Sequence, residues 1–212
     1  MEAVAAEIEA RGRRTARIVS DVTDRSSLDA ALKGVVKALG GVDILVNAAG
    51  RTERRATLDV DEASWNAILD TNLSGTLRSC QVFGRHMLER GYGRIVNIAS
   101  LSSFVALYEV AAYSASKAAV ASLTKSLALE WGPRGVNVNA IAPGVFPTDL
   151  NRSLLEGTGR GREFLARTPL QRFGRVEELR GAAVFLSSAA ASFVNGEVLT
   201  VDGGFLASGV NQ

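Results

Sequence analysis

The sequence predicts one domain of the α/β class, built as a doubly wound, mostly parallel sheet with helices on both faces. Short apolar runs bounded by Gly, Asn and Asp alternate with longer segments of helical period almost throughout the chain, a pattern typical of a parallel sheet wrapped by helices. With 212 residues, 47% of them hydrophobic, the chain fits one domain spanning residues 1–212 better than two. A Rossmann-like fold is therefore expected.

The expected elements keep this alternation from one end of the chain to the other. The first part holds a helix at 2–11, the strand TARIVS at 15–20, a helix at 26–38 and the strand VDILVN at 42–47. A long helix at about 62–89 leads to the strand RIVNIA at 94–99, a helix at about 111–131 and the strand VNVNAIA at 136–142. A helix near 176–187 and the strand EVLTV at 197–201 complete the domain.

Residues 149–175 break the alternation, and we interpret them as a flexible lid over a substrate site. They contain Gly157, Gly159, Gly161 and six arginines but little apolar periodicity, as in mobile loops that close over ligands. The run GTGRG at 157–161 could be read as a phosphate-binding turn. No strand precedes it, so the lid interpretation is preferred.

Composition argues against several classes of partner. The formal net charge is +2, with 24 basic residues scattered among 22 acidic ones, so no basic stripe for nucleic acid is expected. The single cysteine, Cys80, has no partner for an internal disulfide, and no Cys/His cluster has metal-ligand spacing. No apolar run has the length of a membrane span and the first residues lack a signal-peptide pattern. A cytoplasmic protein that binds neither nucleic acid nor membrane is predicted.

Marked residues follow four of the predicted strands. In an open α/β sheet the ligand binds outside the carboxyl ends of the strands, and small residues there let a flat ligand approach the backbone. Each group alone is also explained by a helix cap or a turn, but together they predict a crevice of cofactor size. The groups are Asp21 and Val22, then Asn47, Ala48, Ala49 and Gly50, then Ser100, and finally Pro143 and Gly144.

Tyr113 and Lys117 form the strongest candidate for proton-transfer chemistry. They are four residues apart in YSASK and so share one helical face. A tyrosine becomes a proton-transfer group near neutral pH only when a nearby cation stabilises the phenolate, which Lys117 can do. Ser100 could orient a substrate oxygen toward the phenol, and Asn72 could hold a water near Lys117. The alternative for an isolated Y-x-x-x-K is a packed tyrosine beside a snorkelling lysine.

The order and spacing of these motifs resemble the short-chain dehydrogenase/reductase family. The resemblance rests on NAAG after a strand, Asn72, Ser100 thirteen residues before Tyr113, YSASK, PGVFPT at 143–148 and VDGGF at 201–205. It runs from residue 1 almost to the end of the chain. The overall pattern and the ending GGFLASGVNQ look like the gluconate 5-dehydrogenase type, which acts on sugar acids or polyols, and also like 3-oxoacyl-carrier-protein reductases.

The resemblance implies roles for the catalytic candidates. Tyr113 would be the general acid/base, and Lys117 would lower its pKa and bond the nicotinamide ribose. Ser100 would polarise the carbonyl or alcohol, and Asn72 would support a water-linked proton relay. The reaction implied is hydride transfer between a secondary alcohol or ketone and NAD or NADP.

The resemblance also implies a cofactor surface. Asp21 and Val22 would flank the adenine, while Asn47, Ala48, Ala49 and Gly50 would pack beside the cofactor and stabilise the sheet. Tyr113 and Lys117 would contact the nicotinamide half. The residues expected to border the nicotinamide ring and its carboxamide are Pro143, Gly144, Val145 and Thr148.

The chain departs from the family pattern at its start. Members normally open with a strand, a turn of the T-G-x-x-x-G-x-G type, a helix and a second strand, and this chain opens at the helix before the third strand. About one βαβ unit is missing, which points to a truncated chain. We expect weakened dinucleotide binding, unpaired strand edges and no readable preference between NAD and NADP.

Two functions remain open at this point. One is the oxidoreductase; the other is a non-catalytic oligomerisation or regulatory partner that has lost the cofactor. By resemblance the protein is expected to form a tetramer or dimer through the helices at 62–89 and 111–131. Arginines of the lid segment could attract an anionic alcohol or ketone substrate, or they could keep a loop solvated: Arg152, Arg160, Arg162, Arg167, Arg172 and Arg175.

Overall fold

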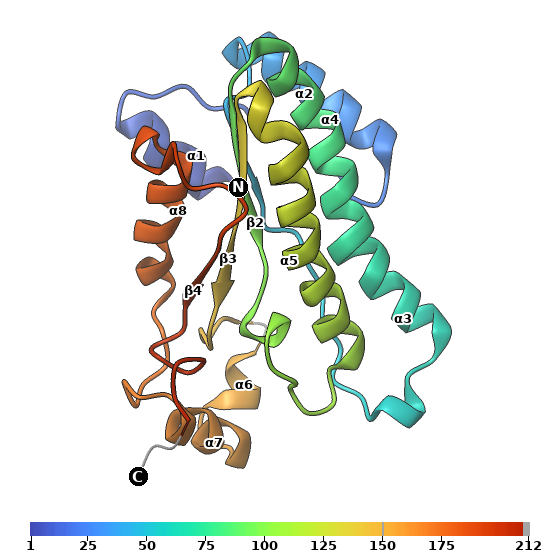
Figure 1. Cartoon of the computed structure of the whole chain (residues 1–212), viewed down its shortest axis with the longest axis vertical. Coiled ribbons are helices and arrows are strands. Elements are labelled where there is room, and N and C mark those ends of the chain that lie inside the picture. The colour runs from blue at the N-terminus through green and yellow to red at the C-terminus, as the bar shows by residue number, and fades with distance from the viewer. Residues whose placement is uncertain (150, 210–212) are drawn as a thin grey trace.

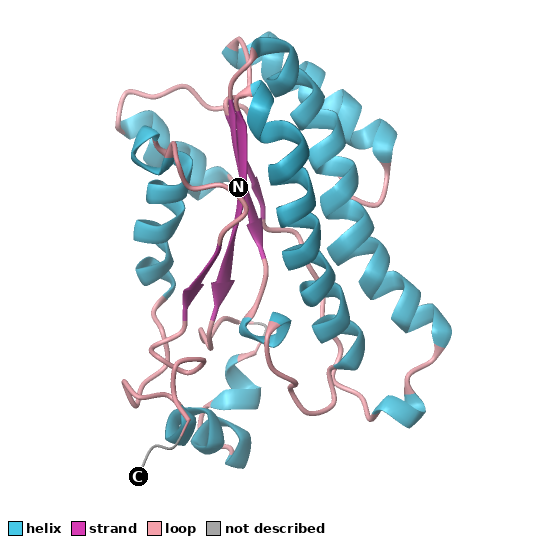
Figure 2. Ribbon diagram, viewed as in Figure 1, coloured by secondary structure: helices cyan, strands magenta, loops and turns pink. Residues whose placement is uncertain are grey.

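The computed structural model describes residues 1–149 and 151–209. It shows a four-stranded parallel sheet with helices on both faces (Figures 1 and 2). The strands are β1 (Ile44–Asn47), β2 (Gly93–Ile98), β3 (Val136–Pro143) and β4 (Val198–Val201). They pair in chain order, each parallel to the next. The predicted α/β class is confirmed, and all four carboxyl ends meet at one edge.

Helices form a layer on each face of the sheet. On one face α4 (Gly75–Arg90) and α5 (Ala111–Trp131) pack against the strands, with α2 (Arg25–Leu39) against α4. On the other side lie α8 (Arg180–Ser187) and α1 (Glu2–Ala10) (Figure 1). No described helix is both long and apolar enough to span a membrane.

Successive residues of β2 pack against the helices on opposite faces of the sheet. Ile95 packs with Met87 of α4 and Val138 of β3, whereas Val96 packs with Leu186 of α8. All are almost fully buried, and removing such a side chain from water contributes about 1.5–3 kcal/mol. The sheet is thus covered on both faces, which explains why its strands read as continuous apolar runs.

The predicted long helix at 62–89 is interrupted near its middle. It comprises α3 (Glu62–Leu69), a π-helical turn at Asp70–Ser74 and α4. Asp61 begins α3 by accepting a hydrogen bond from the backbone N–H of Ser64. A π-turn inside a helix is uncommon and is often found at functional sites. This one contains the polar Asn72.

The predicted strand at 15–20 is wrong. The segment is not assigned to a strand and has no ladder hydrogen bond to another described segment. Its side chains pack instead along α2: a Cβ added at Gly34 would lie 2.7 Å from Cδ1 of Ile18. An apolar sequence favours extended backbone, but a strand also requires a hydrogen-bonded neighbour. The strand predicted at 42–47 is β1, which begins two residues later than expected.

The segment 149–175 contains two short helices that its sequence did not predict. They are α6 (Arg152–Leu155) and α7 (Gly159–Arg167), and they lie beyond the carboxyl ends of the strands (Figure 1). GTGRG begins α7: the hydroxyl of Thr158 accepts a hydrogen bond from the N–H of Gly161 at 3.0 Å. Within this segment residue 150, like residues 210–212 of the ending GGFLASGVNQ, lies outside the described residues.

Candidate active site

A cavity of about 470 Å³ opens at the carboxyl edge of the sheet. Its walls come from the ends of β2 and β3, the start of α5, and helices α6 and α7 of the segment 149–175. Six of the predicted site residues line it: Ser100, Tyr113, Pro143, Gly144, Val145 and Thr148. The marked residues after β2 and β3 therefore share one cavity, and Tyr113 at the start of α5 lines the same cavity.

Tyr113 and Lys117 lie on adjacent turns of α5. The Nζ atom of Lys117 is 5.7 Å from the centroid of the Tyr113 ring. Lys117 is 5% exposed and donates a hydrogen bond to the carbonyl of Ile98 at 2.6 Å. Burial lowers the pKa of Lys117 from 10.5 to about 8, because the charged form loses hydration.

Burial dominates the ionisation of Tyr113. It raises the pKa of the phenol above 10.0, while a side-chain hydrogen bond with Ser100 acts in the opposite direction. The ammonium group of Lys117 donates to the Ile98 carbonyl, and the expected lowering of the Tyr113 pKa by Lys117 stays a prediction. Tyr113 is accordingly protonated at neutral pH.

Ser100 stands where β2 ends and the chain turns toward α5. Its hydroxyl oxygen accepts a hydrogen bond from the N–H of Ser102 at 3.1 Å, which caps a short 3₁₀ turn at Leu101–Ser103. Its hydroxyl proton remains free to serve Tyr113 or a ligand oxygen. Ser100 is buried at 7% exposure, so its orientation is set by the fold.

Asn72 connects three elements from the π-turn. Its Oδ1 accepts a hydrogen bond from the N–H of Arg51 at 2.8 Å, and its Nδ2 donates to the Arg51 carbonyl and to the Ser116 hydroxyl at 2.9 and 3.0 Å. The loop after β1 is thereby attached to α5 one residue before Lys117. A Cβ added at Gly50 would lie 3.5 Å from Oδ1 of Asn72 and 3.8 Å from Nζ of Lys117. The Asn72 side chain therefore acts as a clamp, in the sense that its hydrogen bonds join the loop after β1 to α5. Its predicted role in holding a water stays a prediction.

The first predicted cofactor group does not line the cavity. The carboxylate of Asp21 accepts hydrogen bonds from the backbone and side chain of Thr23 at 2.8 and 2.7 Å, which lower its pKa. Val22 packs against Gly75 at the start of α4, where an added Cβ would lie 2.8 Å from Cγ2 of Val22. Asp21 therefore forms a turn with Thr23, and the helix cap that was its alternative role belongs to Asp24, which begins α2.

The NAAG segment after β1 divides into an inner and an outer part. Nδ2 of Asn47 donates to Oδ1 of Asn97 at 2.9 Å, and Nδ2 of Asn97 donates to the Thr124 hydroxyl at 3.0 Å. Asn47 thus joins β1, β2 and α5 from within. Ala48, Ala49 and Gly50 are exposed and form a small-residue surface beside Asn72.

The end of β3 forms the wall opposite α5. The N–H of Gly144 donates to the Val201 carbonyl at 2.8 Å, and an added Cβ would lie 2.6 Å from Cα of Asp202. Only glycine fits this contact between β3 and the turn after β4. Thr148 is exposed, and its N–H and hydroxyl approach Oδ1 of Asn151 at 2.7 and 3.3 Å.

Two arginines from different elements line the cavity, and the sequence indicated only one of them. Arg160, of α7, lies 5.4 Å over the Phe164 ring and donates to the Tyr108 carbonyl at 3.2 Å. Arg54, of the loop after β1, was missed, and its positive charge is one reason, after burial, that the pKa of Arg160 is lowered. The other predicted arginines do not line the cavity: Arg152, Arg162, Arg167, Arg172 and Arg175.

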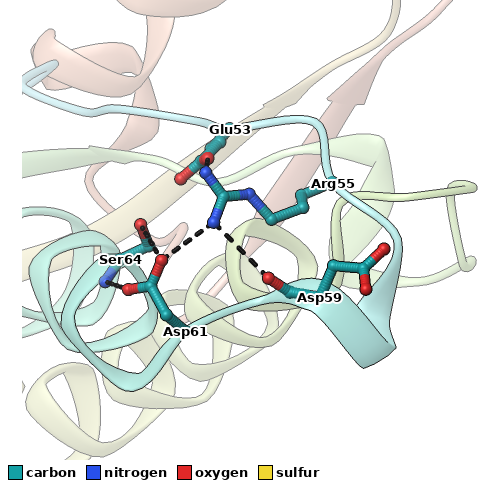
Figure 3. A network of polar contacts seen from close by, with 5 residues as sticks. All are labelled: Glu53, Arg55, Asp59, Asp61 and Ser64. Atoms are coloured by element: carbon teal, nitrogen blue, oxygen red, sulfur yellow. Dashed lines mark hydrogen bonds and ion pairs between the residues drawn. The ribbon is translucent and has the colours of Figure 1, made fainter.

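The neighbouring Arg55 faces away from the cavity. Figure 3 shows its guanidinium between Glu53 and Asp61, and it also donates to the Asp59 carbonyl. This network holds the loop after β1 to the start of α3, where Asp61 is the capping residue. In the run RTERRAT nothing distinguishes one arginine from the next, so the sequence offered no signal for Arg54.

The Ser100, Tyr113 and Lys117 side chains gather at the carboxyl edge of a parallel sheet, which is where open α/β enzymes bind their ligands. The family described as enoyl-(acyl carrier protein) reductase matches residues 1–206. The chain belongs to the short-chain dehydrogenase/reductase family and to its enzymes that act on CH–OH groups.

Several relatives within this family are named for sugar acids, and others are named for the polyols galactitol and D-threitol. Gluconate 5-dehydrogenase of Gluconobacter oxydans is 42% identical over 94% of this chain and 78% of its own length. 5-Keto-D-gluconate 5-reductase of Escherichia coli is 40% identical over 88% of this chain and 73% of its own. A solved gluconate 5-dehydrogenase of Burkholderia cenocepacia, in complex with NADP and tartrate, is 39% identical; the match covers 98% of this chain and 81% of that one, with a TM-score of 0.93.

Proposed function

We propose that the chain interconverts a secondary alcohol and a ketone of a small polyhydroxy acid with NADP or NAD as cofactor, and that Tyr113 is its acid/base. The observation that carries the proposal is one cavity lined by both Ser100 and Tyr113, with the buried Lys117 one turn further along α5. The family membership and this group favour an enzyme over a non-catalytic partner.

In the direction of ketone reduction, the residues act on the carbonyl oxygen. Ser100 donates a hydrogen bond that polarises the carbonyl, and the phenol of Tyr113 transfers its proton as negative charge develops on the oxygen. Lys117 then stabilises the phenolate electrostatically. The nicotinamide, when bound, supplies the hydride. Oxidation of the alcohol follows the same path in reverse.

The residues around Lys117 suit a nicotinamide cofactor. Ala48, Ala49 and Gly50 present exposed backbone with small side chains, which lets a large ligand approach closely. We assign the nicotinamide half to Lys117, Tyr113 and the wall at Pro143, Gly144, Val145 and Thr148. Asn47 acts from inside the sheet, and Asp21 and Val22 are assigned to the adenine half.

The substrate is proposed to carry a carboxylate. Arg54 and Arg160 place two guanidinium groups on the cavity wall, and the charge of Arg54 contributes, after burial, to the lowered pKa of Arg160. Guanidinium groups match carboxylates in charge and geometry. The relatives named for gluconate and ketogluconate, and the neighbour in complex with tartrate, support this substrate class.

Three further assignments stay proposals. The segment 149–175 acts as a lid, which is supported by the α6 and α7 residues that line the cavity. The protein assembles as a tetramer or dimer through α4 and α5. It works in the cytoplasm.

A substitution at Tyr113 tests the proposed reaction. Tyr113→Phe removes the transferable proton while keeping the ring, so turnover of 5-keto-D-gluconate with NADPH should fall by about 10²- to 10⁴-fold. Tyr108→Phe, at an exposed position, is the matched control and should retain turnover. The absorbance of NADPH at about 340 nm measures the rate of turnover of each variant. We expect a rate near zero for Tyr113→Phe and a rate near that of the wild type for Tyr108→Phe. Equal turnover in wild type and Tyr113→Phe would contradict the assignment.

A further inference from the structure

Glu109 has an unusual backbone conformation at the entrance to α5. Its φ is +64°, one of two positive values among the described residues other than glycine. A side chain in this left-handed region costs on the order of 1 kcal/mol, so the surrounding contacts must hold it there. The residue precedes Val110, the capping position of α5, and lies four residues before Tyr113.

Two contacts fix Glu109 to the loop after β1. Its carbonyl accepts a hydrogen bond from the N–H of Arg55 at 2.8 Å. Its carboxylate meets the side chain of Arg54, with Oε2 2.7 Å from Nε. One residue thus holds the backbone of this loop and orients the arginine that lines the cavity.

The contact with Arg54 is made on the side of the guanidinium. A carboxylate bound there engages at most two of the five N–H donors and leaves the others for a second acceptor. No second acidic partner of Arg54 exists among residues 1–149 and 151–209. Glu109 itself does not line the cavity, whereas Arg54 does. The carboxylate therefore lies behind the guanidinium rather than in the space a substrate would occupy.

We propose that Glu109 is a positioning residue that orients Arg54 to bind the carboxylate of the substrate. This inference rests on the proposed function, because it assumes an anionic substrate in the cavity. Glu109 acts by restricting the guanidinium of a long, flexible side chain, so that less conformational entropy is lost when the substrate binds. Its negative charge also opposes the binding of anions, so orientation and charge have opposite effects.

The two effects are separated by two substitutions. Glu109→Ala removes both the charge and the side-chain oxygen that contacts Nε, and should weaken gluconate binding roughly tenfold by freeing Arg54. Glu109→Gln keeps an acceptor for Nε and removes only the charge, so it should bind gluconate within about twofold of wild type or more tightly. Calorimetric titration with gluconate, without cofactor, measures each dissociation constant.

The controls are matched in place and chemistry. Glu53→Ala removes a carboxylate of similar exposure that pairs with Arg55 instead of Arg54 and should bind gluconate like wild type. Arg54→Ala should weaken gluconate binding at least as much as Glu109→Ala. Titration with galactitol, which has no carboxylate, should give equal affinity for wild type and Glu109→Ala.

Other outcomes overturn the inference or the function on which it rests. Unchanged or tighter gluconate binding by Glu109→Ala would mean that the carboxylate is a bystander or a competitor. Equal weakening by Glu109→Gln would mean that a side-chain oxygen beside Nε does not orient Arg54, which contradicts the inference. Absence of gluconate binding by wild type would refute both this inference and the anionic substrate. Normal binding effects without any ketone reduction would refute only the proposed reaction.

Discussion

Burial shifts the pKa values of Tyr113 and Lys117 in opposite directions. It raises the pKa of Tyr113 and lowers the pKa of Lys117 to about 8, so the neutral form of each residue is favoured. For Tyr113 the neutral form is the one that would donate the proton in the proposed ketone reduction. For Lys117 it means that a substantial share of the side chains is uncharged in mildly alkaline solution.

The buried Lys117 should leave a signature in the pH dependence of stability. Its folded pKa of about 8 lies below the ordinary 10.5, so between these values the unfolded chain binds more protons. The free energy of unfolding should therefore rise with pH from 8 to 9, as part of a full effect on the order of 3 kcal/mol. Urea denaturation at several pH values measures it.

Lys117→Met should lack this rise, while Lys125→Met, at an exposed position on the same helix, should keep it. The range ends at pH 9 because burial raises the pKa of the Cys80 thiol from 9.0 to about 12, which lowers the stability of the folded state at higher pH, as the raised pKa of Tyr113 does above pH 10. A wild-type stability that stays flat or falls between pH 8 and 9 would contradict the burial of a titrating Lys117.

At the scale of elements, the π-turn is the junction between the catalytic helix and the rest of the site. Asn72 is fully buried within the turn, and its amide group joins the loop after β1 to α5. The same loop carries Arg54. Both the proposed proton-transfer group and the proposed anion site therefore depend on one side chain that does not itself line the cavity.

Asn72→Ala should lower the free energy of unfolding by about 3 kcal/mol, because it removes three hydrogen bonds of a fully buried side chain. Asn66→Ala, at an exposed position on α3, should change stability by less than about 0.5 kcal/mol. Equilibrium unfolding in urea compares the two. Equal stability of the two variants would show that the clamp is dispensable.

At the scale of the whole molecule, the sheet has an open edge. β1 pairs with β2 on one side and with no described strand on the other, and Ile44 and Val46 are each 47% exposed. The extended segment 15–20 nearby is equally unpaired, with Val19 85% exposed. Unpaired edges with apolar side chains favour association between molecules.

A charge on this edge should reduce such association. Val46→Lys places a charge on the exposed strand, so the concentration at which scattering rises should increase several-fold relative to wild type. Leu58→Lys removes a fully exposed apolar side chain away from the sheet and is the matched control. Light scattering across a concentration series distinguishes them. An equal effect of both substitutions would attribute association to general hydrophobicity.

Local patterns in the sequence predicted the parts of the site that local structure determines. Ser100 ends a strand and Tyr113 lies one helical turn from Lys117, so their placement follows from spacing alone. Thr15–Ser20 failed because a strand depends on a neighbour that a local pattern does not report. Arg54 was not predicted because only its tertiary contact with Glu109 distinguishes it from the two other arginines of the loop. Glu109 makes this contact from a positive φ that its residue type does not predict.

The walls of the cavity come from separate stretches of the chain, and this bears on how the protein can be changed. The proton-transfer residues lie within 100–117, whereas α6 and α7 form one continuous stretch within 149–175. Exchange of 151–170 between relatives alters the part of the wall that faces the substrate and leaves Ser100, Tyr113 and Lys117 in their own elements. Substrate choice can therefore diverge, in nature or by engineering, without rebuilding the chemistry.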